Sequence, residues 1–199
     1  MKKFLFTIII QVVFVYCLIA QNIGIGINTP QAKLHIKGSA DTSQLVIDAN
    51  STQLNTHPLI RLRSAAGVDL VHIHSDHTTN TFLGLNSGRV NNAGGGALGN
   101  TFIGSQSGAS NLTGASLTGI GTYSLLNNIA GKENTAVGPS TLYYNTFGSY
   151  NTAMGRGALF QNINTDNNTA IGFKSLFSNI GVNNTAIGSQ SLISNTNGQ

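Results

Sequence analysis

One phrase decides the fold of this chain, and it reads Asn-Thr-Ala-Ile-Gly-Phe-Lys-Ser-Leu-Phe-Ser-Asn at residues 168–179. Seven variants of the phrase occur in residues 80–199, and they start 20, 17, 17, 17, 17 and 16 residues apart. Their central glycines are Gly84, Gly104, Gly121, Gly138, Gly155, Gly172 and Gly188. A period this short and regular indicates one structural unit stacked on itself. A scaffold of this kind is more often a rod or a binding surface than an enzyme.

Alignment on the central glycine produces columns of like residues. Every copy has Thr three residues before the glycine, an apolar residue one before it, and a small residue three after it. Gly or Leu stands four residues after the glycine. The residue seven after it is always Asn: Asn91, Asn111, Asn128, Asn145, Asn162, Asn179 and Asn195.

These columns predict an all-β fold, a parallel β-solenoid with coils about 4.8 Å apart. Seventeen residues hold two strands of about five residues and two turns, but not a packed helix pair. The Thr column and the apolar column lie two residues apart, so we expect them to share one strand face, and that pairing favours an interior or interface face. The glycine allows a turn, and the Leu column is expected on a second strand. The Asn is expected at the next turn, with its amide bonded to the next Asn along the stack.

The residue after the Leu column is also apolar in five copies: Leu126, Tyr143, Phe160, Phe177 and Ile193. On a strand, this column faces away from the Leu column and forms an exposed apolar stripe. Monomers rarely leave such a stripe bare, so it predicts self-association, with a trimer favoured. The alternative is that these residues lie in a bend and fold inward.

Residues 1–20 are interpreted as a secretory signal peptide, because Lys2 and Lys3 precede the apolar run 4–19 and a small residue, Ala20. An uncleaved membrane anchor and a lipoprotein modified at Cys17 are the alternatives. Cys17 is the only cysteine, so the mature chain would have no disulfide.

Residues 21–79 are expected to form a β-strand neck or cap before the array of residues 80–199. Apolar and polar residues alternate in two short segments around a turn at residues 28–30. Three further strands are expected, at residues 44–49, 59–63 and 68–74. A stacked array needs such an end piece, because a bare terminal coil exposes its hydrogen-bonding edge.

Charge is scarce, since only 8% of residues are Asp, Glu, Lys or Arg, against about 25% in an ordinary domain. There is no basic patch with interleaved aromatic residues, so nucleic-acid binding has little support. The array has only two acids, Glu133 and Asp166, in separate loops, so paired acid–base catalysis is not expected. We therefore expect no enzyme and assign no catalytic, cofactor or metal residue.

Two local patterns keep other readings open. His72 and His74 would share a strand face near His77; in a parallel trimer six imidazoles would converge on the axis and suit a transition metal. The alternative is a group of solvated histidines that bind no metal. The Thr column also matches the ranks of Thr that some β-solenoids use to bind ice, although an Ile two residues along favours an interior or interface face instead.

The Asn-Thr-Ala-Ile-Gly phrase resembles the head repeats of trimeric autotransporter adhesins, whose phrase is close to Ser-Val-Ala-Ile-Gly. It also resembles repeats of phage tail-fibre-like bacterial surface proteins, and residues 22–36, Asn-Ile-Gly-Ile-Gly-Ile-Asn-Thr-Pro-Gln-Ala-Lys-Leu-His-Ile, look like the start of that second group. The resemblance implies a left-handed β-roll, a trimer, and a surface or adhesive role on the outside of a bacterium. The repeat here is slightly longer than in the adhesins, and no stalk, membrane barrel or chaperone domain is recognisable. The chain stops at Asn-Thr-Asn-Gly-Gln in the middle of a repeat and without a cap, so we expect a truncated array.

The main hypothesis is a secreted or surface-displayed structural module that binds a host surface, a matrix or a glycan. The alternative is a carbohydrate-binding or carbohydrate-active solenoid. Its candidate sugar-stacking residues are Tyr143, Tyr144, Tyr150 and Phe173.

Overall fold

The computed structural model describes residues 23–25, 27–29, 32, 34–36, 38, 45–48, 57–196 and 198. The chain forms two compact units, residues 1–48 and 49–199. The expected signal peptide at residues 1–20 lies outside the described residues.

The first unit contains two short strands, β1 (Ile23–Ile25) and β2 (Leu34–Ile36). They pair in parallel, with Ile23 opposite Leu34, so both predicted strands are present. The strand expected at residues 44–49 was wrong for the part described, because residues 45–48 are in no strand.

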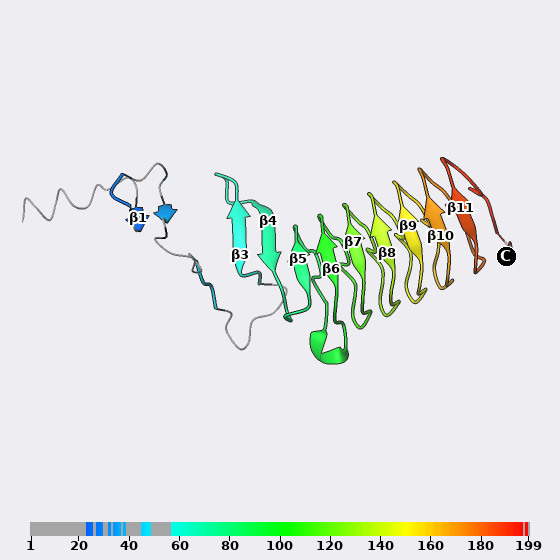
Figure 1. Ribbon diagram of the computed structural model, residues 1–199, viewed down its shortest axis with the longest axis horizontal. Coiled ribbons are helices and arrows are strands. Elements are labelled where there is room, and N and C mark those ends of the chain that lie inside the picture. The colour runs from blue at the N-terminus through cyan, green and yellow to red at the C-terminus, as the bar shows by residue number, and fades with distance from the viewer. Residues whose placement is uncertain are drawn as a thin grey trace, which may run out of the picture. The chain divides into compact units, whose positions relative to one another are not determined.

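Residues 57–196 contain one nine-stranded sheet, ordered β11-β10-β9-β8-β7-β6-β5-β4-β3 (Figure 1). Its strands are β3 (Ile60–Arg63), β4 (Asp69–His74), β5 (Thr81–Leu83), β6 (Thr101–Ile103), β7 (Thr118–Ile120), β8 (Thr135–Val137), β9 (Thr152–Met154), β10 (Thr169–Ile171) and β11 (Thr185–Ile187). Strands β5 to β11 are parallel, and each Thr pairs with the Thr of the next coil. The predicted all-β parallel β-solenoid is confirmed, and the described residues form no α-helix, only a short 3-10 helix, η1 (Ala93–Gly95).

The strands β3 and β4 form an antiparallel hairpin that pairs with β5. They confirm the strands predicted at residues 59–63 and 68–74, each one residue shorter at its start. The hairpin covers the N-terminal edge of β5, which would otherwise present unpaired backbone groups.

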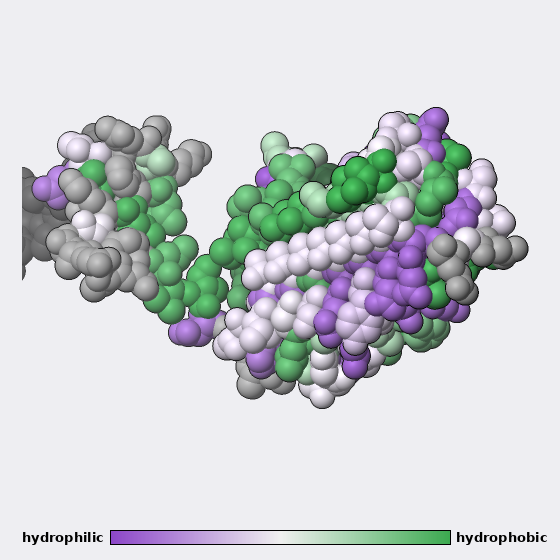
Figure 2. Space-filling model, turned by 45° about the vertical axis from the view of Figure 1, so that its right-hand side comes forward, coloured by the Kyte–Doolittle hydropathy of each residue, from purple (hydrophilic) through white to green (hydrophobic). Residues whose placement is uncertain are grey.

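Each array strand buries its middle residue and turns its two ends outward. The buried middle residues are Phe82, Phe102, Gly119, Ala136, Ala153, Ala170 and Ala186. The Thr and apolar columns share a face, as expected, but that face is the outside of the coil and not its interior. Residues of like hydropathy therefore line up in bands along the array (Figure 2).

The expected second strand is absent from the described coils, because the Leu column lies in a bend. Leu125, Leu142, Leu159 and Leu176 have φ values of 50°, 50°, 49° and 46°, in the left-handed region, which no strand tolerates. Left-handed φ costs an ordinary residue about 1–2 kcal/mol, whereas burying a Leu side chain contributes about 1.5–3 kcal/mol. All four side chains are fully buried, so burial outweighs the strain.

The central glycines have φ between 114° and 135°, as the sequence predicted from their turn. A second restriction is steric: a Cβ on Gly121 would lie 2.7 Å from the carbonyl carbon and oxygen of Gly138 in the next coil. The column is therefore required by conformation and by the close stacking of coils.

Two ladders of buried Asn side chains run along the interior. In the turn ladder, amide nitrogens donate to the Asn of the preceding coil, as from Asn128 to Asn111 at 2.8 Å and from Asn145 to Asn128 at 2.8 Å. Asn179 is an exception, because its amide donates to the carbonyl of Gly181. The strand-end ladder lies just before the Thr column and comprises Asn80, Asn100, Asn134, Asn151, Asn168 and Asn184, with Leu117 replacing Asn in the third coil. The predicted bonding of Asn to Asn along the stack is confirmed.

Candidate functional site

The N-terminal hairpin closes the interior of the array with a histidine ring. His74 pairs with Phe82 across the strands, and its ring lies 5.2 Å from the Phe82 ring, between centroids. The side chain is only 6% exposed, and neither ring nitrogen has a hydrogen-bond partner in the part of the chain that the structure describes. His74 therefore continues the stacked pair of Phe82 and Phe102 towards the N-terminus.

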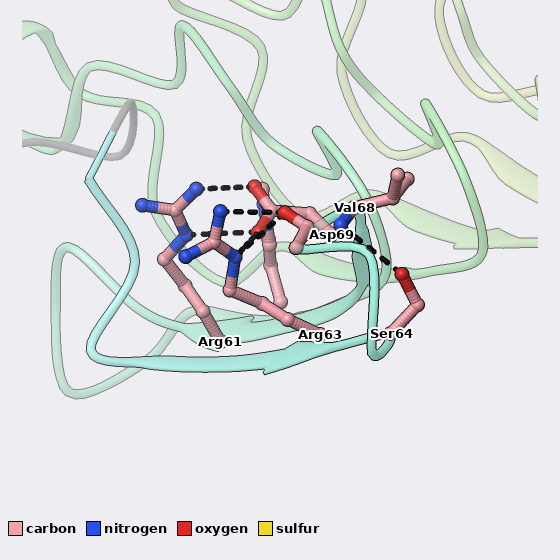
Figure 3. Close-up of polar contacts among 7 residues, drawn as sticks. Arg61, Arg63, Ser64, Val68 and Asp69 are labelled. Carbon is pink, nitrogen blue, oxygen red and sulfur yellow. Dashed lines mark hydrogen bonds and ion pairs between the residues drawn. The ribbon is translucent and has the colours of Figure 1, made fainter.

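The neighbouring polar cluster lies on the same hairpin. Arg61 binds Asp69 through two nitrogens, at 3.2 and 2.5 Å, and Arg63 approaches the same carboxylate at 3.2 Å (Figure 3). His72 Nε2 lies 3.2 Å from Asp69 Oδ2. Hydrogen bonding from Arg61 lowers the pKa of Asp69, which burial opposes. The cluster links β3 to β4 through the side chains of Arg61, Arg63 and Asp69.

In the single chain, His72 and His74 do not present the exposed face that the axial metal site considered from the sequence needs. His72 and His74 share a face, as predicted, but that face is buried against the array and does not point outward. The ring of His77 is exposed and bonds Thr79. Within residues 57–196, no three His, Cys, Asp or Glu side chains come together.

Asp76 terminates both Asn ladders, a role that sequence reasoning missed. Its carboxylate accepts from Asn80 at 2.7 Å and from Asn91 at 2.9 Å. Both ladders leave amide donors at their N-terminal ends, and one acid satisfies both. An isolated Asp just before the first repeat was the available indication.

The outward face of the array strands is uncharged and has an apolar column beside the Thr column along its length. Its apolar residues are Leu83, Ile103, Ile120, Val137, Met154, Ile171 and Ile187. Most are exposed, and Ile187 reaches 70%. The Thr hydroxyls beside them make no hydrogen bond within the described residues. We name this surface the strand face.

The stripe expected from the second strand has a different form. Tyr143, Phe160 and Phe177 lie half-buried in the bend and stack on one another, with centroids 5.0 and 4.9 Å apart. Lys174 Nζ lies 5.2 Å from the Phe177 ring centroid. These rings do not lie on a strand face and do not fold fully inward. Much of their apolar surface is buried within the chain, because they stack on one another.

A groove follows the array beside these rings, formed by three adjoining hollows of about 570, 380 and 320 Å³. The first and second share Ser110 and Asn127, and the second and third share Tyr144 and Ile163. Tyr144 is 46% exposed. The remaining lining residues are Asn86, Arg89, Gln106, Ala109, Leu126, Ile129, Thr146, Gln161 and Ile180.

Of the four aromatic residues proposed for sugar stacking, Tyr143 and Tyr144 contact each other, with ring centroids 4.8 Å apart. Only Tyr144 lines the groove, whereas Tyr143 is in the aromatic stack. Tyr150 and Phe173 are exposed but line none of the three hollows. The two acids of the array are also separate in role, since Glu133 is exposed and Asp166 accepts a hydrogen bond from the backbone of Ser149 at 2.7 Å.

No protein-family model, curated protein or solved structure matches this chain. In the described residues, no helix is both long and apolar enough to cross a membrane.

Proposed function

We propose that this chain is a non-enzymatic structural module of a secreted or cell-surface fibre, and that it self-associates side by side into a trimer. The strand face is the observation that carries the proposal. It is uncharged and has an apolar residue in each of seven coils, and monomeric proteins rarely expose such a surface.

We propose the strand face as the surface of self-association, in place of the apolar stripe that the sequence analysis suggested. The stripe residues already stack within the chain, whereas Ile120, Met154 and Ile171 point into solvent. Three rods with their strand faces turned inward would bury these side chains about a common axis and close the assembly.

Light scattering of the purified chain tests this proposal. We expect a trimer that becomes monomeric in the double variant Ile120→Lys/Ile171→Lys, because burying unpaired charge in an apolar interface is costly. The matched control is Ile129→Lys/Ile163→Lys, which places the same charges on the groove and should leave the trimer intact. A wild-type monomer at high concentration would contradict the proposal.

A second candidate function, carbohydrate binding, is favoured by the groove. Exposed Tyr144 offers an aromatic face, and the amides of Asn86, Gln106 and Gln161 make no hydrogen bond within the described part of the chain. Three adjoining hollows suit a chain of sugar residues better than one compact ligand. Arg89, the one charged side chain lining the hollows, favours a glycan with a carboxylate towards that end.

Glycan-array binding tests this second function. Tyr144→Ala should lower binding at least tenfold, and Arg89→Gln should lower binding of acidic glycans selectively. Tyr150→Ala is the control, because Tyr150 is at least as exposed as Tyr144 but lines none of the three hollows. Loss of binding in the control alone would reject the groove.

A further inference from the structure

We propose that the β3–β4 hairpin is an acid-opened cap, in which protonation of His74 releases the hairpin from β5 and exposes the N-terminal edge of the array. The proposal does not depend on the fibre or glycan functions. It rests on the position of His74 in the cap, where the ring is buried against Phe82 and neither nitrogen has a hydrogen-bond partner in the described residues.

The surroundings of His74 offer little to a positive charge. Its ring lies against the Phe82 ring, and neither of its nitrogens has a full hydrogen bond in the described region. The strand β5 contributes only Thr81, Phe82 and Leu83, none of which is charged. Charging a ring this buried therefore disfavours the closed cap.

The charged and titratable groups on neighbouring elements do not compensate. On its own strand, His72 is near and pairs with Asp69, which Arg61 and Arg63 of β3 already hold. Asp76, in the following turn, is engaged by the amides of both Asn ladders.

The direction of the pKa agrees with this geometry. Burial lowers the pKa of His74 and the neighbouring His72 lowers it further, while the backbone of Ser87 and the carboxylate of Asp76 act in the opposite direction. In an opened cap the ring would titrate near its ordinary value of about 6.5. The open state therefore binds the proton more tightly, and opening is favoured as pH falls below about 6.5 and not above it.

Opening has a defined structural consequence. The backbone N–H of Gly84 donates to the carbonyl of His72 at 2.9 Å, and β5 pairs with β4 through Leu83 and Phe82. Releasing β4 breaks these contacts and leaves the edge of β5 free to pair with another strand. The rest of the array keeps its own ladder of parallel pairs.

Amide hydrogen exchange followed by NMR tests the proposal on the full chain. After correction for intrinsic rates, the opening constant at Gly84 should rise by up to about tenfold per pH unit below about pH 6.5. The N–H of Thr152, which donates to Asn168 at 2.8 Å within the array, is the internal control and should not change. Equal protection of Gly84 at pH 7.5 and pH 5 would overturn the proposal.

Two variants separate His74 from its neighbour. His74→Phe extends the ring stack of Phe82 and Phe102 without a titratable group, so the pH dependence at Gly84 should disappear. His72→Gln should keep it. A His74→Phe chain that still loses protection in acid would reject the role of His74.

A measurement on the wild type guards against a variant that does not fold. The ring resonances of His74 should titrate below pH 6.5, and over the same range as the exchange at Gly84. Titration of the closed cap at or above pH 6.5 would also overturn the proposal.

Discussion

The first two coils and the later coils fill the same interior from different positions in the repeat. In the first two, the buried strand residue is a phenylalanine, Phe82 or Phe102, and the bend residue is Gly88 or Gly108. From the fourth coil onward the strand residue is Ala and the bend residue is Leu. The third coil joins the two patterns, with Gly119 beneath the Phe102 ring and Leu125 in the bend.

The comparison shows that volume is conserved across a coil and not at a single position. A Cβ on Gly88 would lie 2.7 Å from the Phe82 ring, so ring and bend side chain exclude each other. Close-packed interiors have room for one of them. The two glycines that interrupt the Leu column are thus a second solution to the same packing problem.

The largest expected effect comes from converting one pattern into the other. Phe102→Ala should cost about 3–5 kcal/mol by leaving a cavity, and Gly108→Leu should destabilise the chain because its Cβ would meet the Phe102 ring. The double variant recreates the later pattern and should recover much of the loss, measured by urea denaturation. If the double variant loses the sum of the two single losses, the ring and the bend side chain do not fill the same space and the comparison fails.

A smaller loss is expected at the central glycine, which both regions share. Gly121→Ala should cost about 3 kcal/mol through φ strain and a collision with Gly138. Gly96→Ala is the control, because Gly96 also has positive φ, 95°, but a Cβ there meets nothing within 4 Å. We expect it to cost about 1 kcal/mol. Equal losses of stability for Gly121→Ala and Gly96→Ala in thermal denaturation would mean that φ strain alone, and not the contact with the next coil, requires glycine in this column.

The smallest of the three effects is expected in the turn ladder. Asn145→Ala removes bonds to Asn128, Asn162 and Gly148 and should cost about 2 kcal/mol, since buried partners lose hydrogen bonds. Asn127→Ala, in the bend of the preceding coil, removes one side-chain bond, to the carbonyl of Tyr143, and should cost about 0.5–1 kcal/mol. Both variants are measured by urea denaturation. An equal loss of unfolding free energy in Asn127→Ala and Asn145→Ala would show that the ladder adds no more stability than an ordinary side-chain hydrogen bond.

The repeat phrase was sufficient to predict the parallel stacking, the glycine turn and the Asn ladder. Each of these three features depends on one column of the repeat, and the residue type in that column has one main structural role at that position. The second strand was not predictable from Leu125 and its equivalents, because a period of two does not reveal that an apolar residue adopts left-handed φ. For the same reason the outward face was assigned to the wrong residues.

The candidate sites were harder to predict from the sequence than the fold. The adjacency of His72 and His74 was predicted, but their direction depends on which face of β4 meets Phe82, and pairing alone decides that. Tyr144 was named, whereas its groove partners come from several coils. Asp76 was missed because its role exists only where two ladders end together.

The turn ladder also gives the array a direction along its axis. Every amide in the turn ladder that bonds along the stack donates towards the N-terminus, so the dipoles add and cannot be reversed in a single coil. A coil inserted upside down would oppose donor to donor. A whole 17-residue unit, by contrast, has donors on its N-terminal side and acceptors on its C-terminal side, so one unit can be added or removed without breaking the ladder.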